Sequence, residues 1–157
     1  MSVEEQRIGL CSFRVAGETF GIETGAVQEA FRHVHVHPVP MAPEFVAGVL
    51  AYRGEVLTAV DLRAVLGLAA AEKPGCGLVL RDSGNGELFA LLIDSLADVV
   101  EAEQEDWEPN PAQLDARQAQ VFRGAYRNGA LPLVRLDAER LQPSWLLREM
   151  ETSGGRA

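Results

Sequence analysis

The sequence has 157 residues, of which 47% are hydrophobic, and it carries a formal net charge of −9 at pH 7. This length allows one domain, or two very small subdomains that share a core, and the acidic balance disfavours binding to nucleic acids or anionic membranes, which need a basic surface. There is no run of about 18 apolar residues of the kind that spans a bilayer, so we expect no membrane insertion.

The predicted elements are mostly short strands, each followed closely by a turn. In the first half of the chain, the pattern predicts a hairpin at 8–15 and 18–22, a helix at 23–32, an extended segment at 33–44, a hairpin at 45–52 and 55–60, and a helix at 62–66. In the second half, it predicts strands at 77–80, 88–93 and 97–102, with a turn at 82–86, and a loop at 103–119. A hairpin at 121–126 and 131–136 and one or two short helices at 136–150 complete the chain.

The helix at 23–32 is predicted from its apolar spacing. Val27, Ala30 and Phe31 fall at i, i+3 and i+4, which is one helical face, and Thr24 can act as the N-cap. Val27 and Glu29 would then lie on different sides of that helix.

The most informative segment is 48–67, GVLAYRGEVLTAVDLRAVLG. Two apolar runs flank a tight turn at Arg53 and Gly54, Asp61 can cap the helix that follows, and Gly67 can close it. An arginine on a rigid turn suits recognition of a carboxylate on a partner better than chemistry in a cleft, although it could also simply point into water.

A weaker copy of this unit occupies 124–141, GAYRNGALPLVRLDAERL, with its turn at Asn128 and Gly129 and its helix opened by Asp137. One unit used twice, together with nine or ten short strands, predicts an all-β fold with a few short helices. The expected architecture is a pair of small, closed or nearly closed β-barrels.

The acidic residues are unevenly spread. Residues 82–116 contain ten acids and no Lys or Arg, whereas the rest of the chain has 13 acids and 14 bases. This stretch is either a solvated face or a surface for a basic partner. Within it, Glu101, Glu103 and Glu105 alternate and favour a solvated edge, while Trp107, like Trp145 further on, is expected to be half-buried at a barrel end.

The alternation of His33, His35 and His37 places three imidazoles on one face of an extended strand, so a metal-binding protein or metalloenzyme is the alternative function. Neighbouring histidines on such a face are about 6.5–7 Å apart, which makes convergence of all three on one ion difficult. We therefore expect no metal and no other cofactor.

No pattern of catalytic residues emerges from the sequence. It has no Gly-x-Ser-x-Gly, phosphate-binding Gly-rich or His-Glu-x-x-His motif. Cys11 lies in an apolar strand where a thiol is unreactive, and Cys11 and Cys76 are too few for a disulfide scaffold. From the missing catalytic motifs we expect that the protein is not an enzyme. The N-terminal MSVEEQR lacks the basic and then apolar pattern of a secretion signal, so we expect a cytoplasmic protein.

Three strings, VQEAFR, HVHPVPMAPEFVAGVLAYRGEVLTAVDLR and ALLIDSLADVVEAEQEDWEPNP, resemble the CheW family over about residues 8–147. The resemblance implies two SH3-like five-stranded β-barrel subdomains, intertwined and packed across a hydrophobic seam, with tails at 1–7 and 148–157. Three positions depart from the family pattern: Thr58 and Ala59 replace an Ile/Val-Pro pair, and Ile93 replaces the valine of a Val-Asp pair.

The resemblance also implies a function. Family members are non-catalytic adaptors that link the cytoplasmic hairpin tip of a chemoreceptor to the regulatory, CheW-like domain of a histidine autokinase, and copies can join into rings. A member that blocks the array instead of coupling it remains an alternative. The implied receptor- or kinase-binding residues are Val27, Glu29, Gly48, Arg53, Gly54, Leu78 and Val79, and Glu29 is expected to pair with Arg53.

Overall fold

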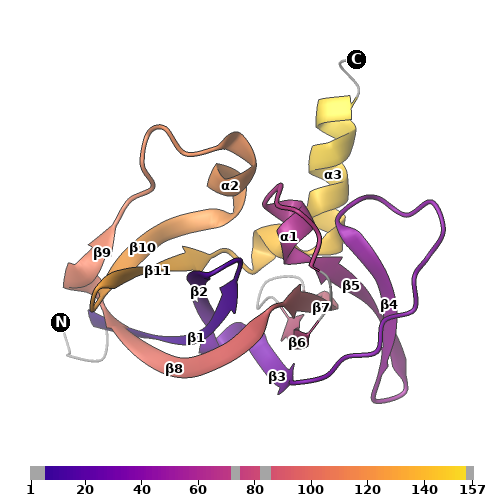
Figure 1. Ribbon diagram of the computed structural model, residues 1–157, viewed down its shortest axis with the longest axis horizontal. Coiled ribbons are helices and arrows are strands. Elements are labelled where there is room, and N and C mark those ends of the chain that lie inside the picture. Colours follow the sequence, from indigo (N-terminus) through magenta and orange to yellow (C-terminus); the bar gives the residue numbers. More distant parts are fainter. Residues whose placement is uncertain (1–5, 72–74, 82–85, 155–157) are drawn as a thin grey trace.

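The structure is a computed structural model that describes residues 6–71, 75–81 and 86–154. Over these residues the chain forms mainly strands, with three short α-helices and three 3-10 turns (Figure 1). The strands are β1 (Arg7–Val15), β2 (Glu18–Glu23), β3 (Val27–Phe31), β4 (Val46–Tyr52), β5 (Glu55–Asp61), β6 (Cys76–Arg81), β7 (Leu88–Ile93), β8 (Ser95–Glu103), β9 (Trp107–Glu108), β10 (Phe122–Asn128) and β11 (Leu131–Leu136). The helices are α1 (Leu62–Val65), α2 (Ala116–Val121) and α3 (Pro143–Gly154), and the 3-10 turns are η2 (Thr24–Ala26), η3 (Gln104–Asp106) and η4 (Glu139–Leu141).

The strands form two sheets, ordered β8-β1-β2-β11-β10-β9 and β3-β6-β7-β5-β4, which we call sheet A and sheet B. Apart from the two-residue β9, the sheets repeat one topology. In each, a hairpin joins the rest of its sheet by a parallel pairing, β11 with β2 in sheet A and β5 with β7 in sheet B. The two copies of the repeated sequence unit therefore occupy equivalent places, which confirms the expectation of two SH3-like subdomains.

The two subdomains exchange strands. The chain leaves β2 in sheet A and enters sheet B as β3, which pairs with β6. It later leaves β7 in sheet B and enters sheet A as β8, which pairs with β1. Figure 1 shows β8 and β3 crossing between the sheet A unit on the left and the sheet B unit on the right. Neither sheet is thus built from one continuous stretch of chain.

The largest core cluster lies between the two sheets. It combines Phe13 and Phe20 from sheet A with Leu78 and Leu91 from sheet B, all buried. Smaller clusters fill each unit separately, around Tyr126 in sheet A and around Tyr52 and Val79 in sheet B. Because adjacent residues of a strand face opposite sides, Leu78 of β6 faces the seam and Val79 faces the inside of its own unit.

The sequence prediction was wrong at residues 23–32, where a single 3-10 turn leads into strand β3 instead of a helix. Val27, Glu29 and Phe31 are half-buried while Gln28 and Ala30 are exposed, which is the period of a strand. A register shift between Val27 and Glu29 nevertheless puts these two residues on opposite faces: Val27 pairs with Leu80 and faces the seam, whereas Glu29 pairs with Val79. Three apolar residues at helical spacing are a weak signal, and pairing with β6 decides the outcome.

The predicted cap at Asp61 is present: Asp61 accepts a hydrogen bond from the Arg63 amide at 3.0 Å at the start of α1. Helix α3 extends to Gly154, past residue 147, where the sequence places the end of the domain. The second hairpin turns one residue later than predicted, because Asn128 pairs with Leu131 and only Gly129 and Ala130 form the loop. The predicted turn at 82–86 falls mostly outside the described residues.

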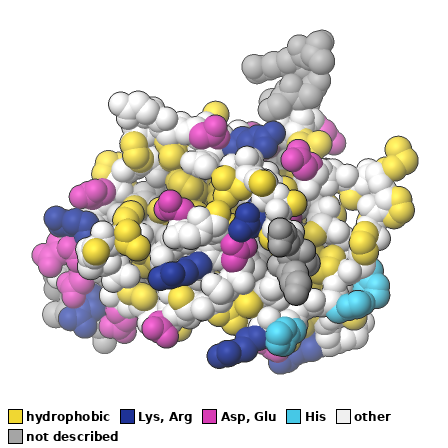
Figure 2. All heavy atoms as spheres, in the orientation of Figure 1, with side chains coloured by type: hydrophobic (Ala, Val, Ile, Leu, Met, Phe, Trp, Pro, Cys, Tyr) yellow, Lys and Arg dark blue, Asp and Glu magenta, His cyan; other side chains and the backbone are white. Residues whose placement is uncertain are grey.

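The acidic stretch is largely paired within the molecule. Arginines from elsewhere in the chain contact Asp94, Glu101, Glu103 and Asp106. Asp115 accepts hydrogen bonds from the first turn of α2. Figure 2 accordingly shows acidic and basic side chains intermixed at the left edge, near β9. Among the described helices, none has the length and apolar character needed to cross a membrane.

Candidate functional site

The turn between β4 and β5 places Arg53 at the end of sheet B. Tyr52 pairs with Glu55, and the two residues between them have positive φ angles of 47° at Arg53 and 80° at Gly54. Two positive φ angles define a type I′ turn, whose twist matches that of the strands it joins. The Arg53 side chain is 73% exposed, so the guanidinium lies on the surface, as the sequence predicts.

The Arg53 side chain is held by contacts with two neighbouring side chains. Its Nη2 donates to Oε1 of Glu29 at 2.7 Å, and the Tyr52 hydroxyl donates to the same oxygen at 3.1 Å. The guanidinium carbon also lies 5.4 Å from the centre of the Tyr52 ring, within cation–π range. We call these three residues the Arg53 cluster; the predicted pairing of Glu29 with Arg53 is confirmed.

The cluster orients Arg53 more than it stabilises the fold. An exposed ion pair of this kind contributes about 0–1 kcal/mol to the free energy of unfolding. Beneath it, Tyr52 is buried and meets Phe31 edge-to-face, with 5.9 Å between ring centres. Burial and the hydrogen bond to Glu29 raise the pKa of Tyr52, so the hydroxyl stays protonated and remains a donor to Glu29.

Tyr52 was not among the residues singled out from the sequence. The signal that could have found it is alternation along β4, where Leu50 and Tyr52 are buried and Ala51 is exposed. This alternation predicts an inward ring directly before the turn. On the same hairpin, Val56 of β5 pairs with Ala51 on the face opposite Tyr52 and is 72% exposed.

The other predicted site residues lie further in. Val27 is half-buried on the opposite face of β3 from Glu29 and packs against the seam cluster. Leu78 and Val79 are only 2% and 1% exposed, because β6 is covered on both faces. They can shape the site from beneath, but their side chains are not offered to a partner in this structure.

Gly48 is also buried, and the backbone geometry explains why a glycine occupies this position. Its φ of 153° is unfavourable for other residues, and a Cβ here would collide with the carbonyl oxygen of His37. That carbonyl accepts a hydrogen bond from the Val49 amide at 2.9 Å, and the His37 amide donates to the Val49 carbonyl at 2.8 Å. Gly48 thus allows the proline-rich segment to lie against β4.

The three histidines are exposed on that segment, while Val34 and Val36 between them pack inward. All three imidazoles are thus exposed, and Figure 2 shows histidine side chains at the lower right of the molecule. The rings of His35 and His37 are 4.7 Å apart. Among the described residues, however, no group of three His, Cys, Asp or Glu side chains is arranged to hold a metal ion.

The remaining candidates match a structural role. Burial raises the pKa of the Cys11 thiol, which disfavours the nucleophilic thiolate. Trp145 packs partly buried against the seam cluster and so anchors α3. Trp107 is 38% exposed at the edge of sheet A, where its indole N–H donates to the Arg123 carbonyl at 3.0 Å. Trp145 is thus half-buried, as predicted, whereas Trp107 is more exposed than predicted.

Comparison with known proteins gives a consistent result. The model of the CheW-like domain family matches residues 9–144. A chemotaxis protein CheW of Treponema pallidum (strain Nichols) is 28% identical over 96% of this chain and 91% of its own, and one of Rhizobium meliloti (strain 1021) is 31% identical over 82% and 84%. The crystal structure of the scaffolding protein TtCheW from Thermoanaerobacter tengcongensis has the same fold, with a TM-score of 0.75 at 20% identity over 85% of this chain and 91% of the other.

Proposed function

The chain belongs to the CheW-like domain family, and from this premise we propose that it is a cytoplasmic, non-catalytic adaptor of a bacterial chemosensory system. In this role it couples the cytoplasmic hairpin tip of a chemoreceptor to the regulatory domain of a histidine autokinase. Relatives named as chemotaxis proteins and a related scaffolding protein support the proposal.

The observation that carries the coupling role is the exposed, fixed guanidinium of Arg53. A planar cation with several donors recognises a carboxylate by paired hydrogen bonds. Glu29 and Tyr52 hold the guanidinium in place before any partner arrives, which lowers the entropy lost on binding. The Glu29 contact uses one nitrogen, Nη2, and the other donors of Arg53 have no partner among the described residues.

The surroundings of Arg53 suit a helical partner. The same hairpin exposes the apolar Val56, three residues after Arg53 in the chain, and an amphipathic helix presents both apolar and charged groups. We assign the predicted contact role to Glu29, Arg53 and Gly54, with Val27, Gly48, Leu78 and Val79 supporting the surface from within.

Such a contact need not be strong by itself. When receptors, kinase domains and further copies of the adaptor assemble side by side, each linked site raises the effective concentration of the next. Modest individual contacts then produce stable assemblies.

The test is a binding measurement between the full chain and a receptor hairpin-tip fragment. Arg53→Glu reverses the charge of an exposed side chain and should weaken binding at least about tenfold, or about 1.4 kcal/mol, with an unchanged fold. The matched control is Arg127→Glu, because Arg127 precedes the equivalent turn of sheet A and is also exposed, at 65%. Equal binding by both variants and the wild type would contradict the proposed site.

A reconstituted kinase assay separates coupling from blocking. With receptor and autokinase present, a coupler raises receptor-dependent phosphorylation in proportion to its concentration up to saturation, and Arg53→Glu should remove that increase. A steady fall in phosphorylation on adding the wild-type protein would instead identify a component that terminates the array.

A further inference from the structure

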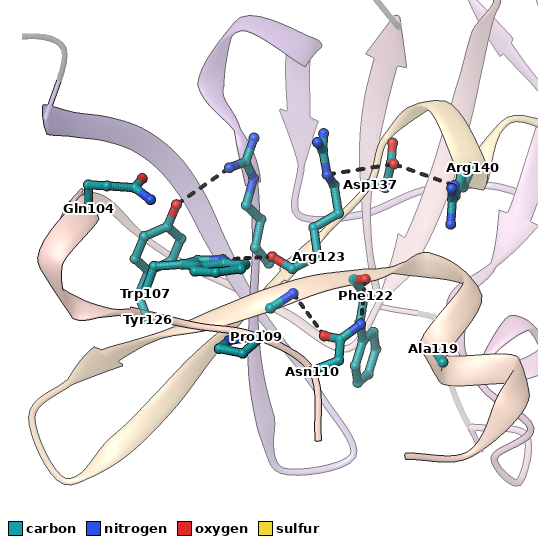
Figure 3. A pocket seen from close by; sticks show the side chains of 12 residues that line it. Gln104, Trp107, Pro109, Asn110, Ala119, Phe122, Arg123, Tyr126, Asp137 and Arg140 are labelled. Carbon is teal, nitrogen blue, oxygen red and sulfur yellow. Dashed lines mark hydrogen bonds and ion pairs between the residues drawn. The ribbon is translucent and has the colours of Figure 1, made fainter. Parts of the chain in front are cut away.

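A second surface feature lies in sheet A, away from the Arg53 cluster. It is a hollow of about 580 Å³ between β9, β10, the second half of α2 and the segment after β11 (Figure 3). This volume falls within the range of about 300–1,000 Å³ that is typical of small-molecule sites. Arg123, Arg135 and Arg140 line it, with Asp137 as the one acidic residue among its lining residues. The hollow is thus cationic in a chain whose net charge is −9.

The two exposed arginines of the hollow have donors available. Nε of Arg123 and Nε of Arg140 approach the same oxygen, Oδ2 of Asp137, at 3.8 Å and 3.7 Å. Both distances exceed hydrogen-bond length. Figure 3 shows Asp137 between the two arginines. Among the described residues, the Arg123 terminal nitrogens have no hydrogen-bond partner, and Arg140 uses only Nη1, on the Gln120 carbonyl.

The third arginine adds buried charge. Arg135 contacts Glu23 and the Tyr126 hydroxyl, but its Nε is buried without a partner among the described residues. Burial lowers the pKa of Arg135, which is the effect of removing a cation from water without full compensation. An anion in the hollow would supply part of the missing compensation.

The opposite wall is aromatic and rigidly held. The Trp107 indole is fixed by its hydrogen bond to the Arg123 carbonyl and lies against Gly124, where a side chain would collide with the ring. Asn110 ties the segment after β9 to β10, because its Nδ2 donates to the Phe122 carbonyl at 3.0 Å and its Oδ1 accepts from the Gly124 amide at 2.8 Å. The wall is therefore formed before any ligand binds.

From this arrangement we propose that the hollow binds a small organic anion, with a carboxylate held by Arg123 and Arg140 and a flat apolar body against Trp107. The guanidinium donors match the carboxylate, and the indole offers a face for the apolar body. None of the residues that line this site belongs to the Arg53 cluster, so the proposal does not rest on the proposed coupling function.

The test is a titration of the full chain with benzoate, followed by NMR. The chain has two tryptophans, so only two indole N–H signals need assignment, and Trp145→Phe assigns them. Benzoate should shift the Trp107 signal saturably. Benzyl alcohol lacks the carboxylate and acetate lacks the ring, so each should bind at least about tenfold more weakly.

Variants show whether the guanidinium is responsible. Arg123→Gln alters a side chain that is 56% exposed, and it should weaken benzoate binding at least about tenfold. Arg127→Gln is the matched control, since Arg127 lies on the same strand but does not line the hollow; it should bind as the wild type does. Three results would overturn the proposal. The first is the absence of any Trp107 shift at about 20 mM benzoate, because a dissociation constant above that concentration is too weak for a specific site. The others are binding of benzyl alcohol as tight as that of benzoate, and unchanged benzoate binding in Arg123→Gln.

Discussion

Arg63 and Asp94 join the two subdomains by a two-pronged ion pair. Nε and Nη2 of Arg63 donate to Oδ1 and Oδ2 of Asp94 at 3.0 Å and 2.6 Å. Arg63 belongs to α1, beside sheet B, and Asp94 also accepts a hydrogen bond at 2.8 Å from the Ala16 amide, in the β1–β2 turn of sheet A. The Val-Asp-Leu-Arg string and the later Ile-Asp string thus meet in space, which gives both a structural role.

Removal of this ion pair should lower stability measurably. Arg63→Ala leaves Asp94, whose side chain is 30% exposed, without its charged partner. Charge-assisted hydrogen bonds contribute about 1.5–3 kcal/mol to the free energy of unfolding, and a loss in this range is expected in urea titrations. The control is Arg127→Ala, which breaks the exposed pair with Asp106 and should cost about 0–1 kcal/mol. Equal losses would contradict a special role for the Arg63–Asp94 pair.

The same ion pair predicts a pH dependence. The hydrogen bonds from Arg63 lower the pKa of Asp94 below its ordinary value. The ionised Asp94 therefore makes its full contribution to the free energy of unfolding above the pKa of the unfolded chain, about 3.9. The contribution is lost as pH falls through the lower, folded pKa. The difference in free energy of unfolding between wild type and Asp94→Asn should stay constant from about pH 8 to 6 and narrow below about pH 5. A difference that persists unchanged to pH 3 would refute this assignment.

Local signals in the sequence were sufficient for the hairpins and caps. The turn at Arg53 and Gly54 and the cap at Asp61 were predictable because each depends on neighbours within a few residues. The repeated unit at 124–141 was also recognisable, although its loop falls one residue later than expected. The exposure of Arg53 followed from the turn itself.

Features that depend on distant parts of the chain were not predictable in the same way. Strand β3 was mistaken for a helix because its partner, β6, lies far along the sequence. Burial of Leu78 and Val79 on opposite faces of β6 depends on the packing of both sheets. The arginines of the sheet A hollow converge only after β10 pairs with β11 and the segment after β11 turns back, so their spacing in sequence carries no signal.

Gly48 should be intolerant of substitution for steric reasons. Gly48→Ala places a methyl group against the His37 carbonyl at a φ that alanine avoids, so we expect a loss of at least about 2 kcal/mol in the free energy of unfolding. Gly54→Ala is the control, because Gly54 also has a positive φ but nothing lies within 4 Å of the added carbon. That variant should lose about 1 kcal/mol. Similar losses in both would show that the His37 contact is unimportant.

The pairing of Glu29 with Arg53 allows a test of how Arg53 acts. Arg53→Glu alone sets two carboxylates against each other at the turn, since Oε1 of Glu29 lies 2.7 Å from the guanidinium in the native pair. The double variant Glu29→Arg with Arg53→Glu restores an ion pair with the charges exchanged. If Arg53 contacts a carboxylate of the receptor tip, the exchange should restore stability but leave binding to the receptor fragment at least about tenfold weaker than wild type. Recovery of full binding in the double variant would show instead that the pair serves only to hold the β4–β5 turn in place and that neither side chain is needed for its own charge.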